Sequence, residues 1–76
     1  MNTADMLIHV HQELDAQTRT ELERKLSGRM GVDCAEFLHT PHPHSLMVRY
    51  DPDALAGMEI LQMVRKLDPV ASMVGL

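Results

Sequence analysis

The sequence predicts an α+β fold in which four strands and two helices follow one another in the order βαββαβ. Short stretches with alternating apolar and polar residues indicate half-buried strands, and two longer stretches have apolar residues at helical spacing. Gly, Pro and Asp residues separate these segments, as turns require. The 76 residues, with 45% hydrophobic and 24% charged side chains, suit one globular domain over residues 1–76.

The first strand is expected at the start of the stretch 6–14, whose side chains alternate between two faces. Ile8 and Val10 point to one face, which can join a core. The opposite face carries Leu7, His9 and His11. Two imidazoles are therefore expected side by side on the face that can meet solvent or a ligand.

The first helix is expected to begin after Asp15, because Asp is a favoured N-cap residue. Leu22, Leu26 and Met30 recur every four residues and form the apolar stripe of this helix. Gly28 marks its end, where a glycine suits a left-handed cap.

Two further strands are expected over residues 33–39 and 46–50, on either side of a turn at 40–45. Pro41 and Pro43 exclude regular ladder pairing within that turn. Alternation places one set of side chains on the core face: Ala35, Phe37, His39, Leu46, Val48 and Tyr50. The outward set comprises Cys34, Glu36, Leu38, Met47 and Arg49.

The second helix is expected to be capped by Asp51-Pro52-Asp53 and to end at Asp68-Pro69. Its apolar face consists of Leu55, Ile60, Leu61, Met63, Val64 and Leu67. A last short strand is expected over residues 70–76. This order matches the ferredoxin-like split βαβ arrangement, a four-stranded antiparallel sheet with two helices on one face and the first strand in the centre.

Gly31-Val32, the strand segment 46–52 and the helix residues Ile60, Met63 and Val64 form a recognisable pattern. This pattern resembles the second half of the heavy-metal-associated (HMA) domain family of small copper and heavy-metal carriers. Leu22, Glu23 and Leu26 are similar to the first helix of that family. The resemblance implies the ferredoxin-like fold. The CxxC metal motif of the family is absent, and Asp15 and Thr18 stand where the two cysteines would be.

His9 and His11 are the first candidate metal ligands, since imidazole binds copper, zinc and nickel. Met47 on a neighbouring strand would add a soft thioether, and Met73 would join it from the last strand. A set of histidines and thioethers makes copper the expected ion, with zinc or nickel as alternatives. The competing interpretation is that these residues are simply polar side chains on a solvated sheet face.

His39, His42 and His44 surround the Pro-rich turn and form a second candidate group, because short His-rich tracts can bind metal. The turn is expected at the same end of the sheet as the end of the first strand. His11 would therefore approach His42 or His44. The competing interpretation is an exposed loop tip whose histidines are only solvated.

These observations predict a small, non-catalytic metal-binding protein, a carrier or sensor of copper or another transition metal. Its primary ligands are expected to be His9 and His11, with His42, His44 and Met47 as auxiliaries. No nucleophile elbow, glycine-rich phosphate loop or HExxH motif is present, which argues against an enzyme. The alternative is a protein–protein interaction or homodimerisation module that holds no metal and uses an open, partly apolar sheet face.

The composition also bears on location and partners. The net charge is −4 and no basic patch appears, which argues against nucleic-acid binding. No apolar run approaches the ~20 residues that would cross a bilayer, and no signal peptide is recognisable, so the cytoplasm is expected. Cys34 is the single cysteine, which excludes an internal disulfide; it is expected as a small apolar residue or, as the alternative, a thiolate ligand.

Overall fold

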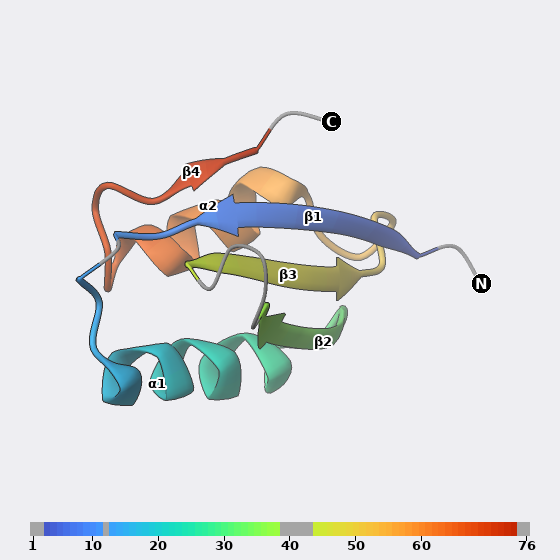
Figure 1. The fold of residues 1–76 in the computed structure, drawn as a ribbon. Helices are drawn as coiled ribbons and strands as arrows, with labels where there is room; N and C mark the ends of the chain where they lie inside the picture. Colours follow the sequence, from blue (N-terminus) through green and yellow to red (C-terminus); the bar gives the residue numbers. More distant parts are fainter. Residues whose placement is uncertain (1–2, 12, 39–43, 75–76) are drawn as a thin grey trace.

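A computed structural model describes residues 3–11, 13–38 and 44–74 of the chain. The elements are β1 (Ala4–His9), α1 (Ala16–Ser27), β2 (Val32–Phe37), β3 (Ser45–Tyr50), α2 (Gly57–Arg65) and β4 (Ser72–Met73). The strands form one antiparallel sheet in the order β2-β3-β1-β4 (Figure 1). The predicted ferredoxin-like βαββαβ fold, with its first strand in the centre, is confirmed.

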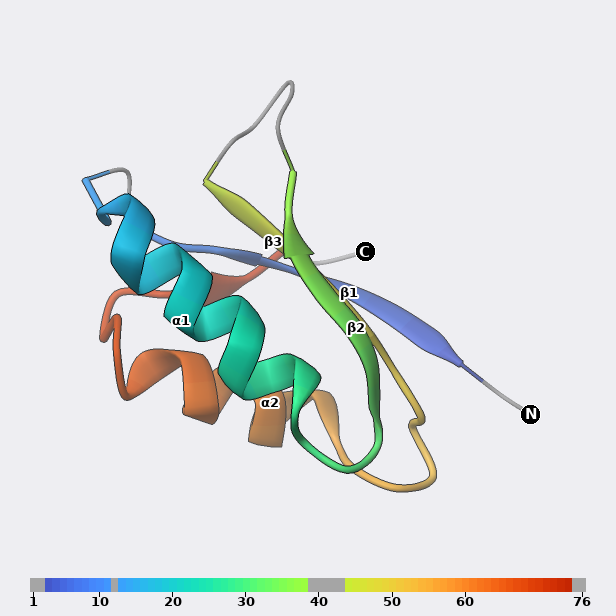
Figure 2. The ribbon, with the colours of Figure 1, turned by 90° about the horizontal axis from the view of Figure 1, so that it is seen from below.

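Both helices lie on the same side of the sheet, as Figure 2 shows. The core between the layers is built from alternate strand residues, since Met6, Ile8 and Val10 are buried while Leu7 and His9 are only partly buried. The helices contribute Leu22, Leu26, Ile60, Leu61 and Val64. The other side of the sheet, which we call the open face, carries Leu7, His9, Met47 and Arg49.

The turn between α1 and β2 differs from the sequence expectation. Gly28 caps the helix in a right-handed conformation, with φ −83°, and its N–H donates to the carbonyl of Arg24. Gly31 is the residue that needs glycine's freedom, because its φ is +96° and a Cβ there would lie 2.5 Å from Leu55 Cδ2. The predicted place of Met30 in the apolar stripe is wrong, since the helix has already ended and Met30 is 91% exposed.

The second helix begins later than the Asp51-Pro52-Asp53 segment predicts. Asp51 instead forms a turn, in which its carboxylate accepts a hydrogen bond from the Asp53 N–H at 2.9 Å. The chain then buries Leu55 before α2 starts after Ala56. Ala56 has no side-chain acceptor, but Glu59 accepts a hydrogen bond from its N–H at 2.9 Å and so supplies half of a capping box.

The last strand is shorter than expected, because the chain turns at Asp68 before it reaches the sheet. The Ala71 N–H donates to the Asp68 carbonyl, and in the described part of the chain only Ser72 and Met73 are strand residues. Met73 lies opposite Ile8, whose side chain faces the helices. Opposed residues share a face, so Met73 does not join the open face as expected.

Candidate metal centre

The predicted ligands gather where β1 ends and β3 begins. His9 is the last residue of β1 and lies opposite Ser45, the first residue of β3. The Val10 N–H donates to the His44 carbonyl at 3.0 Å, which extends the pairing past the strand ends. Strand pairing therefore brings residues from the first and third strands to one end of the sheet.

The rings of His9 and His44 contact each other at this end. Their centroids are 5.1 Å apart and their planes meet at 64°, an edge-to-face arrangement. Both side chains are partly buried. Two of the predicted ligands, which come from segments far apart in the sequence, are thus neighbours in the fold.

His11 lies beyond the end of β1 and is exposed. Its backbone N–H donates to the buried carboxylate of Asp68 at 2.7 Å, and its Nδ1 accepts a hydrogen bond from the Glu13 N–H at 3.1 Å. A neutral imidazole that accepts at Nδ1 carries its proton on Nε2. His11 can therefore bind a metal only if it gives up the Glu13 bond or loses that proton.

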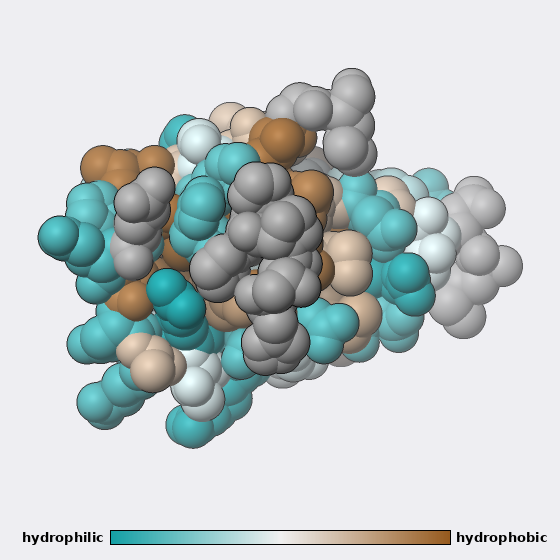
Figure 3. Space-filling model, in the orientation of Figure 1, coloured by the Kyte–Doolittle hydropathy of each residue, from teal (hydrophilic) through white to brown (hydrophobic). Residues whose placement is uncertain are grey.

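Met47 lies on the open face, displaced from the histidine pair along the strands. It is opposite Leu7 on β1 and Glu36 on β2. Leu7 is two residues before His9, which corresponds to a shift of about 7 Å along the strand. Met47 contributes instead to a shallow apolar hollow, lined by Asp5, Met6, Leu7, Leu38 and Met47. In Figure 3 hydrophobic and hydrophilic residues are interspersed on the side of the molecule that is shown.

His42 and His39 lie outside the described residues, together with the rest of segment 39–43. Within residues 3–11, 13–38 and 44–74, no group of three or more His, Cys, Asp or Glu side chains is arranged to hold a metal ion. The described part of the site is therefore a pair of imidazoles. Further ligands have to come from His11, from the segment that is not described or from outside the chain.

Ser45 is a residue of this site that sequence reasoning missed, because it was assigned to the turn. It is 1% exposed, and its Oγ has no hydrogen-bond partner among the described residues. Buried hydroxyls normally have a partner, because an unpaired one has lost its hydration without compensation. The sequence signal that was available is its position next to His44 at the end of an alternating strand.

Asp15 and Thr18, which the sequence resemblance sets against the two cysteines of the HMA motif, lie at the start of α1. The Asp15 carboxylate accepts a hydrogen bond from the Thr18 N–H at 2.7 Å and caps α1. Hydrogen bonds from Thr18, from its side chain first and its backbone second, lower the pKa of Asp15 below its usual value. A capping carboxylate and a threonine do not supply the thiolates that copper(I) prefers.

Cys34 is partly buried on β2 and pairs with Arg49 on β3. Arg49 Nε donates to the Asp5 carboxylate at 3.0 Å, and this bond, followed by the charges of Asp5 and Cys34, raises the pKa of Arg49. Both Arg49 and Asp5 are about half exposed, so their ion pair adds little stability. Cys34 is separated from β1 by the whole of β3.

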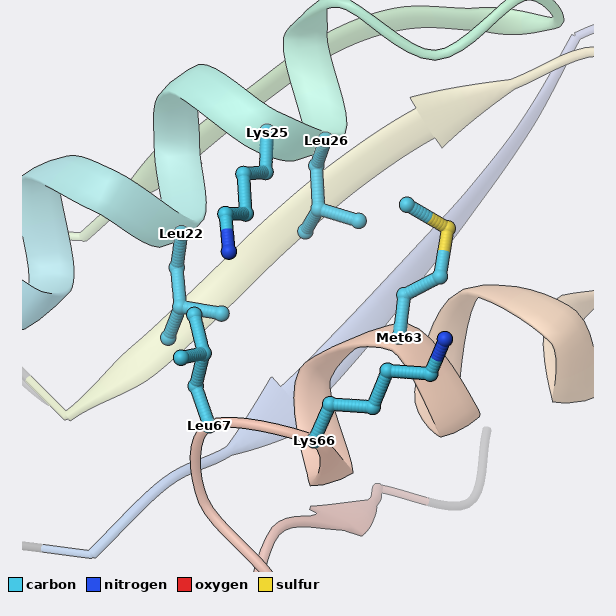
Figure 4. A pocket seen from close by; sticks show the side chains of 6 residues that line it. All are labelled: Leu22, Lys25, Leu26, Met63, Lys66 and Leu67. Carbon is cyan, nitrogen blue, oxygen red and sulfur yellow. The ribbon is translucent and has the colours of Figure 1, made fainter.

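A groove on the other side of the molecule lies between the two helices. It is lined by Leu22, Lys25, Leu26, Met63, Lys66 and Leu67 (Figure 4). Lys25 lies in α1 and Lys66 directly follows α2 as its C-cap. Lys25 also forms an exposed pair with Glu21 at 3.7 Å. None of the described residues that line the groove is a histidine or a cysteine, and none of them belongs to the candidate metal centre.

Comparison with solved structures supports the fold assignment. The chain is similar to the solution structure of the N-terminal domain of a potential copper-translocating P-type ATPase from Bacillus subtilis in the Cu(I)-loaded state, with a TM-score of 0.75. The chain has an HMA-like fold. The match covers 95% of this chain and 85% of that chain at 18% sequence identity, which is a likeness of fold alone. No family model matches the sequence, and no curated protein sequence matches it either.

The helices of the described residues are short. None of them has the length and apolar character needed to cross a bilayer.

Proposed function

We propose that this HMA-like domain binds a transition-metal ion as cargo through histidine nitrogens at the end of the sheet where β1 and β3 meet. The observation that carries the proposal is the contact between His9 and His44, whose ring centroids are 5.1 Å apart. Two imidazoles at this distance are a usable pair of donors for zinc, copper or nickel.

The pair needs further donors to complete a coordination shell. His11 and His42 are the nitrogen donors that we propose for this role, and Met47 is the thioether donor nearest to the pair among the predicted ligands. His11 is anchored close by, because its backbone is tied to the buried Asp68. Binding at His11 would replace one exposed hydrogen bond from Glu13, which is a small loss.

The test is a titration of the full chain with copper(I), copper(II), zinc and nickel, read by calorimetry and by NMR of the histidine side chains. His9→Ala and His44→Ala should each reduce affinity by at least tenfold, because each removes one of two neighbouring ligands. His11→Ala should have a smaller effect. The matched control is Ser72→Ala, which changes an exposed residue that also lies opposite His9. A parent chain that binds none of these ions below millimolar concentration would disprove the proposal.

A second candidate function is a protein–protein interaction module, and the apolar hollow on the open face favours it. Leu7, Leu38 and Met47 contribute to this hollow, and an uncovered apolar sheet face is a surface that proteins use for pairing. In this proposal the chain forms a homodimer through the open face. Met47→Asp should then shift the protein from dimer to monomer in sedimentation velocity. A parent chain that is monomeric at high concentration would rule this candidate out.

A further inference from the structure

We propose that the groove between α1 and α2 docks a helical segment of a partner protein, one that presents an apolar side chain flanked by carboxylates. The groove lies on the side of the sheet that the helices cover, opposite the open face. None of its lining residues belongs to the candidate metal centre, so this interaction is independent of metal binding.

The first argument is the apolar lining of the groove. Leu22 and Leu26 come from α1, whereas Met63 comes from α2 and Leu67 lies just beyond its end. The two residues of each wall are four positions apart, so each wall is about 6 Å long. The groove volume of about 200 Å³ is smaller than the roughly 300–1,000 Å³ of sites that enclose a small molecule. The groove therefore suits one anchoring side chain of a docked protein segment.

The second argument is the position of the two lysines of the chain, Lys25 and Lys66, which both line this groove. In Figure 4, Lys25 reaches from α1 toward α2, and Lys66 extends toward Met63. Lys66 has no ion pair among the described residues. The net charge of the chain is −4, so a groove with both lysines at its rim favours a partner that is locally anionic.

The third argument is that the lysines leave the groove open. Lysine stems often cover apolar surface without any ligand, with the ammonium group in water. Here the groove keeps its volume of about 200 Å³ with the side chains of Lys25 and Lys66 in place. The pair between Lys25 and Glu21 is 3.7 Å long and exposed, so a partner carboxylate can replace Glu21 at small cost.

A helix is the partner segment that fits this arrangement. In a helix, the residues three and four positions before and after a central residue lie on the same face as that residue. A central apolar side chain can therefore enter the groove while carboxylates on both sides of it meet Lys25 and Lys66. Docking of an amphipathic helix through its apolar face is a common mode of peptide recognition.

The probe for the test is an alanine-based helical peptide of about 20 residues. It carries one leucine at its centre and glutamates three and four residues to either side. Two matched peptides replace the glutamates by glutamine or the leucine by alanine. NMR of the full chain at low ionic strength should show that the first peptide shifts the methyl signals of Leu22, Leu26 and Met63. The two altered peptides should bind more weakly by roughly fivefold or more.

Variants of the chain test the role of each lysine. Lys25→Gln and Lys66→Gln should each weaken binding of the glutamate peptide by roughly threefold, and the double variant by roughly tenfold. Arg24→Gln is the matched control, because Arg24 is an exposed cation of α1 that does not line the groove. This control should leave the affinity unchanged. Added salt should weaken binding of the glutamate peptide to the parent chain.

Three outcomes would overturn the proposal. They are equal binding of the glutamate and glutamine peptides, an Arg24→Gln loss as large as that of Lys66→Gln, and tighter binding of octanoate than of the glutamate peptide at the same methyl groups. The last result would identify a small amphipathic carboxylate as the occupant. His9→Ala and His44→Ala should leave peptide binding unchanged, so a failure here is distinct from a failure of the proposed metal binding.

Discussion

Asp15 shows how a single side chain marks the start of a helix. The sequence resemblance sets this residue against a cysteine of the HMA metal motif, and in the structure it caps α1 by accepting the Thr18 N–H. These hydrogen bonds are stronger to the ionised carboxylate than to the protonated acid, which is why they lower the pKa of Asp15. The sequence indicated this cap, because both the residue type and the following helical pattern are local signals.

Asp15→Ala should lower the melting temperature at neutral pH, because it leaves an N–H at the start of α1 without a partner. The folded-state pKa is lowered from 3.8, so the stabilisation is present above about pH 4 and disappears as the pH falls through the lower folded value. The difference between parent and variant should therefore shrink in thermal unfolding at pH 3. Asp15→Asn is the control, since it keeps a cap that does not titrate. An Asp15→Ala deficit that is unchanged at pH 3 would contradict the role of the charge.

At the scale of elements, the turns set where α2 and β4 begin, and the strand and helix patterns in the sequence did not predict those starting points. Alternation and helical spacing correctly located all six elements, but the starts of α2 and β4 were predicted too early. Both errors follow an aspartate–proline pair, where the carboxylate or carbonyl of Asp51 and Asp68 holds a turn of several residues. Asp and Pro suit both a turn and the start of a helix, so the sequence alone does not distinguish a turn from a helix start at these positions. The structure does so by burying the apolar residue that follows each turn, Leu55 and Ala71.

Asp68 is expected to hold two elements together, the end of β1 and the turn that leads to β4. Its buried carboxylate accepts the His11 N–H at 2.7 Å and the Val70 N–H at 3.3 Å. Asp68→Ala should reduce the free energy of unfolding by about 1–3 kcal/mol, because it removes the buried carboxylate that accepts two part-buried backbone hydrogen bonds. Urea unfolding measures this loss. Asp53→Ala, at an exposed site, is the comparison, and equal losses in the two variants would refute the linking role.

At the scale of the whole molecule, the small size of the core limits stability. A chain of 76 residues is expected to have a free energy of unfolding of roughly 4–11 kcal/mol. Leu46 is 0% exposed at the centre of the core between β3 and the helices. His44 directly precedes this strand and His9 lies opposite its first residue, so the geometry of the histidine pair depends on this packing.

Leu46→Ala should cost about 2–5 kcal/mol, which is a large share of the total. We expect a marked fall in the midpoint of thermal unfolding, measured by circular dichroism, and a loss of metal affinity at temperatures where the variant is partly unfolded. Val70→Ala, at a position 64% exposed, should change the midpoint little. A Leu46→Ala variant as stable as Val70→Ala would show that Leu46 contributes little to the core.

The sequence by itself determined the order of the elements, the central place of β1 and the two faces of β1 and β3. The elements and their faces follow from short-range hydrophobic periodicity, because side chains alternate in strands and repeat every three to four residues in helices. The central place of β1 follows from the match of the element order to the ferredoxin-like arrangement. Only the tertiary structure decided that His9 meets His44, that Ser45 is buried beside them, and that Met73 faces the helices. Each of these depends on strand register, which the apolar alternation restricts but which is fixed only when the turns and the paired strands come together.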